Sequence, residues 1–316
     1  MNAAIFAEWL RCQGHRVVHT PSSYWFEAGS RVYQAFPYFW RIAPSEDELL
    51  HLLQKQYAIA LRYSTSVAAP RGKVSYHVVC ERPYDLSVLP RTTRQNVMRG
   101  LQYAHVEPIP ISRLATEGWA MRLDTLQRQE RAGAENEAWW RRLCHSAADL
   151  PGFEAWGAVH EGELVATCLA FTCDDCFTVP YQQSASAHFQ YRANNALFFE
   201  VASQALQRPG IERVFFCLES LDAPGSVDEF KFRMGFTALP VRQRVAFHPW
   251  LAPCLRADSH AILKRWLVRY PQNSVLAKAE GMVRFYLEGR RSPEQQEWPE
   301  GLAPRRNELL PTLPSA

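Results

Sequence analysis

The segment 191–236 constrains the fold of this chain more than any other. Its first part, NALFFEVASQAL, repeats apolar residues at the spacing of one helical face, and a Pro-Gly pair ends the pattern. The run IERVFFCL at 211–218 is apolar, β-branched and aromatic, as in a strand buried on both faces. A second helix is predicted from Ser226, and Gly235 stands where a left-handed residue would end it. This order predicts an α/β fold with a site at the carboxyl end of the buried strand.

Composition excludes several classes of protein. The 316 residues are 47% hydrophobic, which suffices for a large core and about two domains. The formal net charge is only +3, without the basic excess of proteins that bind nucleic acid regardless of sequence. The eight cysteines have no framework spacing, as in reduced intracellular proteins. We find no signal-peptide pattern and no apolar run of the ~20 residues that span a membrane. We therefore expect a soluble, cytoplasmic protein, and the sequence leaves its oligomeric state open.

The first hundred residues alternate between helix and strand patterns. Helices are expected at 3–12 and 45–56, and strands near 17–18, 24–27, 31–36, 57–63 and 74–80. The dense aromatic residues from Tyr24 to Trp40 favour a hairpin packed on a core, and a ligand groove is the alternative. Residues 86–100 predict a helix whose exposed face carries Arg91, Arg94 and Arg99. These arginines are candidates for substrate binding, and a solvated basic face explains them equally well.

From His105 the pattern starts again and then turns helical. Strands are expected at 106–109, 154–160, 163–171 and 177–181, and helices at 112–131 and 135–148. Cys173-Asp-Asp-Cys176 is interpreted as two cysteines flanking a turn, and no metal site is expected. Apolar stripes predict a helical hairpin at 251–289, docked on the preceding domain; a basic membrane-surface helix is the alternative. The proline-rich residues 290–316 predict a flexible tail.

The order of these elements resembles an acyltransferase domain of the GNAT superfamily. More narrowly, DEFKFRMGF at 228–236 is similar to the F-K-x-x-x-G-F motif that closes the Fem-type aminoacyltransferases of peptidoglycan bridges and their acyl-CoA-using relatives. The arginines of 91–99 resemble the basic helix that closes the first half-domain of those proteins. The resemblance implies a GNAT-like mixed sheet flanked by helices. It also implies two tandem copies, a reduced one at 1–104 and a catalytic one at 105–250, before the hairpin and the tail.

The same resemblance implies an N-acyltransferase. Such an enzyme would move an acyl group from acyl-CoA, its co-substrate, to an amine of a small molecule or peptide, without a metal. An enzyme that uses aminoacyl-tRNA as donor is the first alternative, and a catalytically silent acyltransferase-like binding protein is the second. Two departures from the sequence pattern of the superfamily are the reason for the second alternative. The phosphate-binding signature Gln/Arg-x-x-Gly-x-Gly/Ala has lost its glycines after Gln190, and 219–236 lacks the tyrosine that often protonates the leaving thiolate.

Several residues are candidates for the chemistry. Glu219 follows the buried strand directly and is a candidate general base or amine anchor, with a solvated loop carboxylate as the alternative. By the motif match, Lys231 would point toward the donor or the transition-state charge; the alternative is an exposed lysine. Tyr181 and His188 are candidate donors to the oxyanion or carriers of a proton. The candidates for binding the donor are Gln190, Arg192, Asn194 and Asn195 around the start of the helix, and Ser220 after the buried strand.

Overall fold

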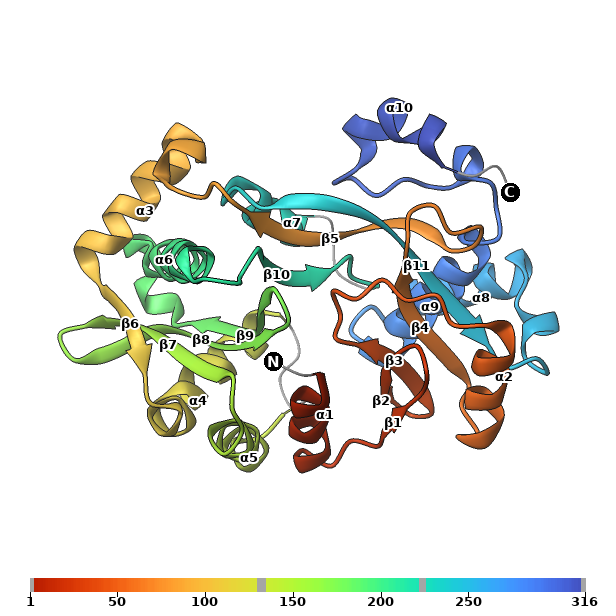
Figure 1. Ribbon diagram of the computed structural model, residues 1–316, viewed down its shortest axis with the longest axis horizontal. Helices are drawn as coiled ribbons and strands as arrows, with labels where there is room; N and C mark the ends of the chain where they lie inside the picture. The colour runs from red at the N-terminus through yellow and green to blue at the C-terminus, as the bar shows by residue number, and fades with distance from the viewer. Residues whose placement is uncertain (1–2, 130–134, 222–225, 314–316) are drawn as a thin grey trace. The chain divides into compact units, whose positions relative to one another are not determined.

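The computed structural model describes residues 3–129, 135–221 and 226–313 (Figure 1). It divides into two compact units that interleave along the chain. Unit 1 consists of Met1–Gly14, Val78–Cys217 and Glu229–Thr237, and unit 2 of His15–His77, Leu218–Asp228 and Ala238–Ala316. The predicted domains, with limits at 104, 250 and 289, are consecutive stretches of the chain, whereas each unit is made of separate stretches. The two tandem copies stay a prediction.

Unit 1 is built on a mixed sheet. Its strands are β6 (His105–Ile109), β7 (Phe153–His160), β8 (Glu163–Cys173), β9 (Cys176–Ser184), β10 (Arg213–Leu218) and the second half of β5 (Lys73–Glu81). They follow the order β5-β10-β9-β8-β7-β6. The strands from β6 to β9 pair antiparallel, whereas β9 and β10 pair parallel. In the register of β8 and β9, Cys173 lies opposite Cys176 across the turn, and both cysteines are free. The predicted turn between two cysteines is confirmed.

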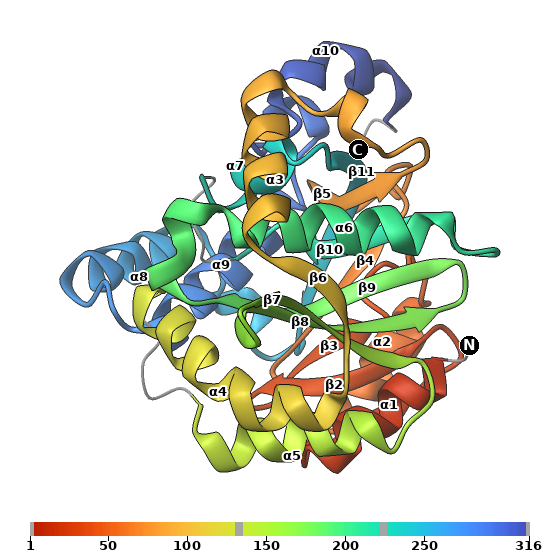
Figure 2. The same cartoon turned by 90° about the vertical axis from the view of Figure 1, so that its left-hand side faces the viewer.

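Helices cover both faces of this sheet. They are α1 (Ala3–Cys12), α3 (Arg91–Tyr103), α4 (Ile111–Arg128), α5 (Glu137–Ala148), α6 (Ala193–Gln207), η2 (Ser186–Tyr191) and, in its second half, α7 (Ser226–Arg233). The helix α6, with α3 beside it, lies on one face, and α4 and α5 lie on the other (Figures 1 and 2). The indole Nε1 of Trp9 donates to the carbonyl of Leu143 at 3.1 Å, so α1 packs against α5 in unit 1.

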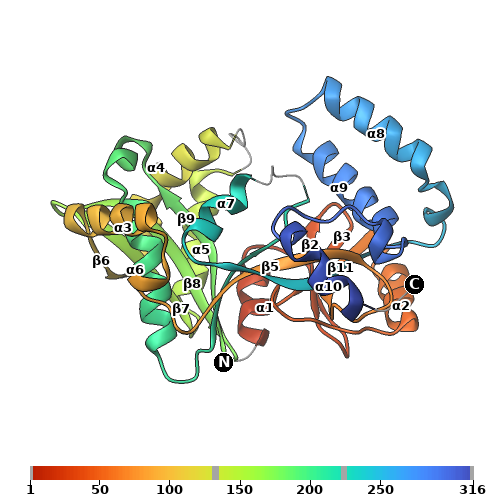
Figure 3. The ribbon, with the colours of Figure 1, turned by 90° about the horizontal axis from the view of Figure 1, so that it is seen from above.

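Unit 2 has strands that belong to the same mixed sheet. Its strands are β1 (Val17–His19), β2 (Tyr24–Gly29), β3 (Val32–Phe36), β4 (Ala60–Thr65), β11 (Thr237–Phe247) and the first half of β5, in the order β1-β2-β3-β4-β11-β5. Its longer helices are α2 (Glu46–Lys55), α8 (Ala257–Arg269) and α9 (Ser274–Glu288), and Figure 3 shows α8 next to α9. Trp25, Tyr33 and Phe36 are completely buried, which confirms the core interpretation of this aromatic run.

The decisive stretch of the sequence folds as predicted. The helix α6, the strand β10 and the helix α7 occur in that order, and Gly235 has φ +83°, the left-handed value that glycine tolerates. Residues 86–100 differ from the prediction, because they form η1 (Leu86–Val88) and then α3 rather than one helix. Pro90 explains the break: it disfavours the helical conformation at Leu89, which is extended with ψ 141°.

The C-terminal segment is more ordered than the flexible tail that the sequence predicts. It forms the short elements η4 (Pro293–Gln295), η5 (Ala303–Arg305), α10 (Arg306–Leu309) and η6 (Leu310–Thr312), after η3 (Ala252–Cys254) earlier in the unit. Gln296 accepts a hydrogen bond from the backbone N–H of Val74 at 2.7 Å, and Leu302 is buried. The proline content therefore stops long helices here without preventing packing. Among the helices of the described residues, none is long and apolar enough to cross a bilayer.

Candidate functional site

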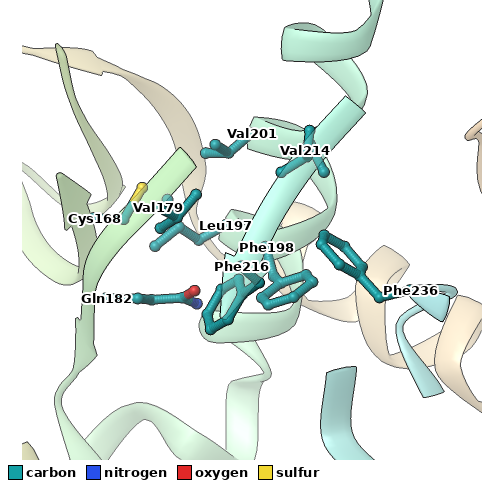
Figure 4. A pocket seen from close by; sticks show the side chains of 10 residues that line it. Cys168, Val179, Gln182, Leu197, Phe198, Val201, Val214, Phe216 and Phe236 are labelled. Carbon is teal, nitrogen blue, oxygen red and sulfur yellow. The ribbon is translucent and has the colours of Figure 1, made fainter. Parts of the chain in front are cut away.

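The parallel strands β9 and β10 separate toward their carboxyl ends. Their pairing runs only from Arg213↔Cys176 to Phe215↔Thr178, although β9 continues to Ser184 and β10 to Leu218. An apolar pocket lies where the two strands part, next to α6 (Figure 4). Its lining residues are Cys168, Val179, Gln182, Leu197, Phe198, Val201, Ala202, Val214, Phe216 and Phe236. In α/β folds, a ligand is expected at the carboxyl ends of the central strands.

Aromatic rings form one wall of the pocket. The ring of Phe198, from α6, lies 4.9 Å from that of Phe216 and 4.7 Å from that of Phe236, measured between centroids. The thiol of Cys168 adds to the apolar character, because burial raises its pKa and keeps it neutral. The lining of the pocket therefore favours an apolar group over a charged one.

One polar side chain of the first turn of α6 contacts the lining of this pocket. Asn194 accepts a hydrogen bond at 2.8 Å from Gln182, which is itself a lining residue. Asn195 lies at the same end of α6, and its amide is 3.3 Å from the sulfur of Met234, which does not line the pocket. Of the five predicted donor-binding residues, Asn194 is therefore the one bonded to the lining, and Gln182 is a lining residue that the sequence analysis missed.

The start of α6 has the form of an anion-binding helix terminus. Arg192 is the N-cap residue with φ +66°, and it makes no side-chain capping bond. The first N–H groups of a helix have no partner within the helix, so they and the positive end of its dipole attract anions. Arg192 and Gln190 are exposed at this point. These features fit a phosphate group although the glycines of the superfamily signature are absent.

Lys231 is buried beside the pocket rather than exposed. Lys231 is 9% exposed. Its Nζ donates to Cys217 Sγ at 3.0 Å and lies 5.1 Å from the ring centroid of Phe216. Phe216 lines the pocket, so the ammonium group is one side chain away from the space where a ligand would bind. A cation so placed can stabilise negative charge that develops on a bound acyl group.

Glu219 lies in unit 2, within a cluster of buried polar side chains. Lys73, which is 2% exposed, donates to Glu219 Oε1 at 2.9 Å, and its Nζ is 4.8 Å from the ring centroid of Phe285. Arg62 donates to the Glu219 carbonyl at 2.8 Å and also bonds the side chain of Gln243. The second carboxylate oxygen, Oε2, is buried and has no hydrogen-bond partner among the residues that the structure describes. Glu219 is thus an ion-paired carboxylate with one open acceptor, and not a solvated one.

Tyr181 does not lie with the pocket, because neighbouring residues of a strand point to opposite faces. Gln182 faces α6, whereas the ring of Tyr181 is about equally close to Trp9, Trp139 and Trp140, at 6.1 to 6.2 Å. Burial raises the pKa of Tyr181 and keeps its phenol neutral.

His188 belongs to an aromatic group at the end of α3. Its Nδ1 lies 2.8 Å from the hydroxyl of Tyr103, whose ring stacks on His160 and Tyr191 with centroids 3.8 and 4.1 Å away. His188 is therefore held by α3 and η2 rather than by the pocket. Ser220, the remaining candidate, follows β10 in unit 2 and is half-buried.

The three candidate arginines of α3 are exposed. Arg94 also bonds the carbonyls of Ser87 and Leu89 at 3.3 Å, so it helps to hold the turn before the helix. Figure 2 shows α3 and α6 side by side, and a Cβ at Gly100 would lie only 2.4 Å from the carbonyl oxygen of Arg192. This close approach, which only glycine permits, brings the basic helix next to the start of α6.

Three other residues of these sites escaped the sequence analysis. Lys73 stands in a polar Pro-Arg-Gly-Lys stretch that predicts a loop, yet it begins β5 and is buried. Cys217 and Gly100 carry no signal of their own, because each matters through a neighbour that is distant in sequence. The position of Lys73, between a predicted loop and a predicted strand, was the one feature of the sequence that could have indicated its role.

The chain matches no family model and no curated protein. Solved structures do match it. The C-terminal domain of a putative lysylphosphatidylglycerol synthetase from Agrobacterium fabrum has a TM-score of 0.53 at 15% identity, covering 85% of this chain and 93% of that one. A conserved protein of unknown function from Bacteroides thetaiotaomicron has the same TM-score at 14% identity, covering 76% and 88%.

The crystal structure of FemX gives a similar result. Its TM-score is 0.53 at 9% identity, and the match covers 78% of this chain and 92% of FemX. At such identities the likeness concerns the fold alone. The mixed sheet flanked by helices is confirmed, and the fold is similar to that of FemX, as the predicted resemblance to Fem-type proteins implies.

Proposed function

We propose that this protein is an N-acyltransferase that moves an acyl group from acyl-CoA to an amine of a small molecule or peptide. The observation that carries the proposal is the apolar pocket where β9 and β10 part, with Lys231 beside it. The pocket would hold the acyl end of the donor, and the start of α6 would hold its phosphates through backbone N–H groups, Arg192 and Gln190.

In this proposal the amine attacks the acyl carbonyl, and the carbonyl oxygen becomes an oxyanion. Collapse of that intermediate forms the amide and releases the thiolate of the donor. Lys231 stabilises the negative charge at this stage, a role that is worth about a hundredfold in rate for one well-placed donor. Glu219, in unit 2, stays a candidate amine anchor or base, as the sequence analysis has it.

An aminoacyl-tRNA donor is the second candidate, and the structure of α3 favours it. The exposed arginines 91, 94 and 99 lie on a helix that runs beside the start of α6, where they would meet the phosphates of a larger donor. Both donors present an activated carbonyl to the same pocket. They differ in how far their phosphates extend from it.

Thermal unfolding with a panel of donors tests the proposal. Ligands that bind only the folded state raise the Tm with their excess over Kd, so acyl-CoAs of increasing chain length, free coenzyme A and a charged tRNA are compared. We expect a rise with an acyl-CoA that exceeds the rise with coenzyme A. A rise with charged tRNA alone would replace acyl-CoA by the second candidate. No rise with any of them would overturn both and favour a silent binding protein.

Two variants of α6 test the pocket itself. Ala202→Leu adds volume to a lining residue, whereas Ala205→Leu overpacks a buried position of the same helix that does not line the pocket. Each costs about 1–3 kcal/mol of unfolding free energy. Only Ala202→Leu is expected to abolish the donor-dependent rise in Tm. Equal rises in the two variants would show that the donor binds elsewhere.

A further inference from the structure

Helix α8 exposes a row of apolar side chains. Ile262, Trp266 and Tyr270 follow one another at intervals of four residues, so they lie along one side of the helix. They are 53%, 56% and 46% exposed, and the rings of Trp266 and Tyr270 stack with centroids 5.9 Å apart. Single exposed apolar residues are common, but a continuous row of them marks an interaction surface.

The opposite side of α8 holds the helix on unit 2. Leu263 and Leu267 are partly buried there, and His260 Nε2 lies 2.6 Å from Glu280 Oε1 on α9. Figures 2 and 3 show α8 next to α9 at the edge of this unit. The sequence predicts one docked stripe that includes Ile262 and Trp266 with the two leucines. The structure divides this stripe, because the two leucines are partly buried and the isoleucine and the tryptophan are exposed.

Basic side chains accompany the apolar row. Arg265 and Arg269 follow Ile262 and Trp266 by three residues each, which places them on the same side of the helix, and both are exposed. Among the residues of α8, Lys264, Arg265 and Arg269 are basic and only Asp258 is acidic. We name Ile262, Arg265, Trp266, Arg269 and Tyr270 the α8 strip.

We propose that the α8 strip docks this protein on the surface of an anionic lipid bilayer. Trp and Tyr rings partition into the boundary between headgroups and acyl chains, and Ile262 adds apolar area that enters this boundary. The arginines complement the negative surface potential of anionic lipids. The proposed contact is that of a helix lying on the bilayer surface. An RNA would use the arginines and the rings but would gain nothing from Ile262.

Vesicle co-sedimentation tests this surface without any substrate. The full chain is mixed with vesicles of phosphatidylcholine alone or of phosphatidylcholine with phosphatidylserine, at low and high salt. We expect binding to the anionic vesicles, weaker binding at high salt because counterions screen the arginines, and little binding to phosphatidylcholine. Vesicles with phosphatidylglycerol should bind as well as those with phosphatidylserine, since the strip recognises charge rather than a headgroup.

Matched variants locate the binding surface. Arg265→Gln with Arg269→Gln should weaken binding about tenfold or more, whereas Arg141→Gln with Arg142→Gln on α5 removes the same charge and should not. Trp266→Ala should release the protein, whereas Tyr57→Ala, at a ring 75% exposed elsewhere, should not. Equal binding by α8 variants and controls overturns the proposal. The proposal is also overturned if the protein binds tRNA but not vesicles, or if it forms a dimer that Trp266→Ala disrupts.

Discussion

Each compact unit buries one lysine over a phenylalanine ring, and the two lysines have different partners. In unit 2, Lys73 lies over Phe285 and donates to the carboxylate of Glu219. In unit 1, Lys231 lies over Phe216 and donates to the thiol of Cys217. Lys73 forms a pair of opposite charges with Glu219, whereas Lys231 lies over a ring that lines the pocket. The comparison teaches that burial of a cation does not by itself indicate its role; its position relative to a pocket also counts.

Lys73→Met gives the largest expected effect, on stability. Methionine keeps the buried stem but leaves the Glu219 carboxylate without its cation, which costs about 3–5 kcal/mol of unfolding free energy. Urea unfolding measures this loss. The double variant with Glu219→Gln should recover part of it, because the two residues interact directly. Additive losses in the double variant would show that the pair is not coupled.

Lys231→Met makes the same change in unit 1 and should act on turnover. We expect kcat/KM for acyl transfer to fall about a hundredfold, or about 2.7 kcal/mol, while the unfolding free energy changes less than in Lys73→Met. Steady-state kinetics with the donor found by the Tm panel measures it. Lys55→Met, at an exposed lysine of α2, is the control. A stability loss equal to that of Lys73→Met, with normal turnover, would make both lysines structural.

Gly100→Ala should cost about 1–3 kcal/mol of stability, because the new Cβ would lie 2.4 Å from the Arg192 carbonyl. Gly281→Ala creates a similar collision in unit 2, 2.5 Å from the carbonyl of Leu221. Both variants should unfold at lower urea concentration, but only Gly100→Ala should weaken the donor-dependent rise in Tm. Gly29→Ala, where a Cβ meets no atom within 4 Å, serves as the control. Equal donor responses in the two glycine variants would separate α3 from the donor site.

Cys217→Asp places a carboxylate where Lys231 now contacts a thiol. We expect turnover to fall about tenfold, because the carboxylate competes with the transition state for the ammonium group, and we expect little change in unfolding free energy. Cys217→Ser is the control, since it keeps a neutral acceptor of similar size. Kinetics and urea unfolding of the two variants are compared. Turnover that is normal in the aspartate variant would mean that the charge of Lys231 is not used.

The sequence determined the local order of elements in this protein. Apolar periodicity and the Pro-Gly stop defined α6, the β-branched run defined β10, and the requirement for a left-handed residue placed Gly235. These features depend on residues that are close in sequence, which is why the fold class followed from the pattern. The position of Lys231 near a site followed only from the resemblance of the closing motif.

Only the tertiary structure decided which side chains meet. Tyr181 and Gln182 are neighbours in the chain, yet strand alternation sends one to the Trp9 side of the sheet and the other to the pocket. Glu219 pairs with Lys73 across 146 positions of sequence, and Gly100 approaches Arg192 through the packing of two helices. Such contacts depend on the register of strands and the crossing of helices, which a local sequence pattern does not encode.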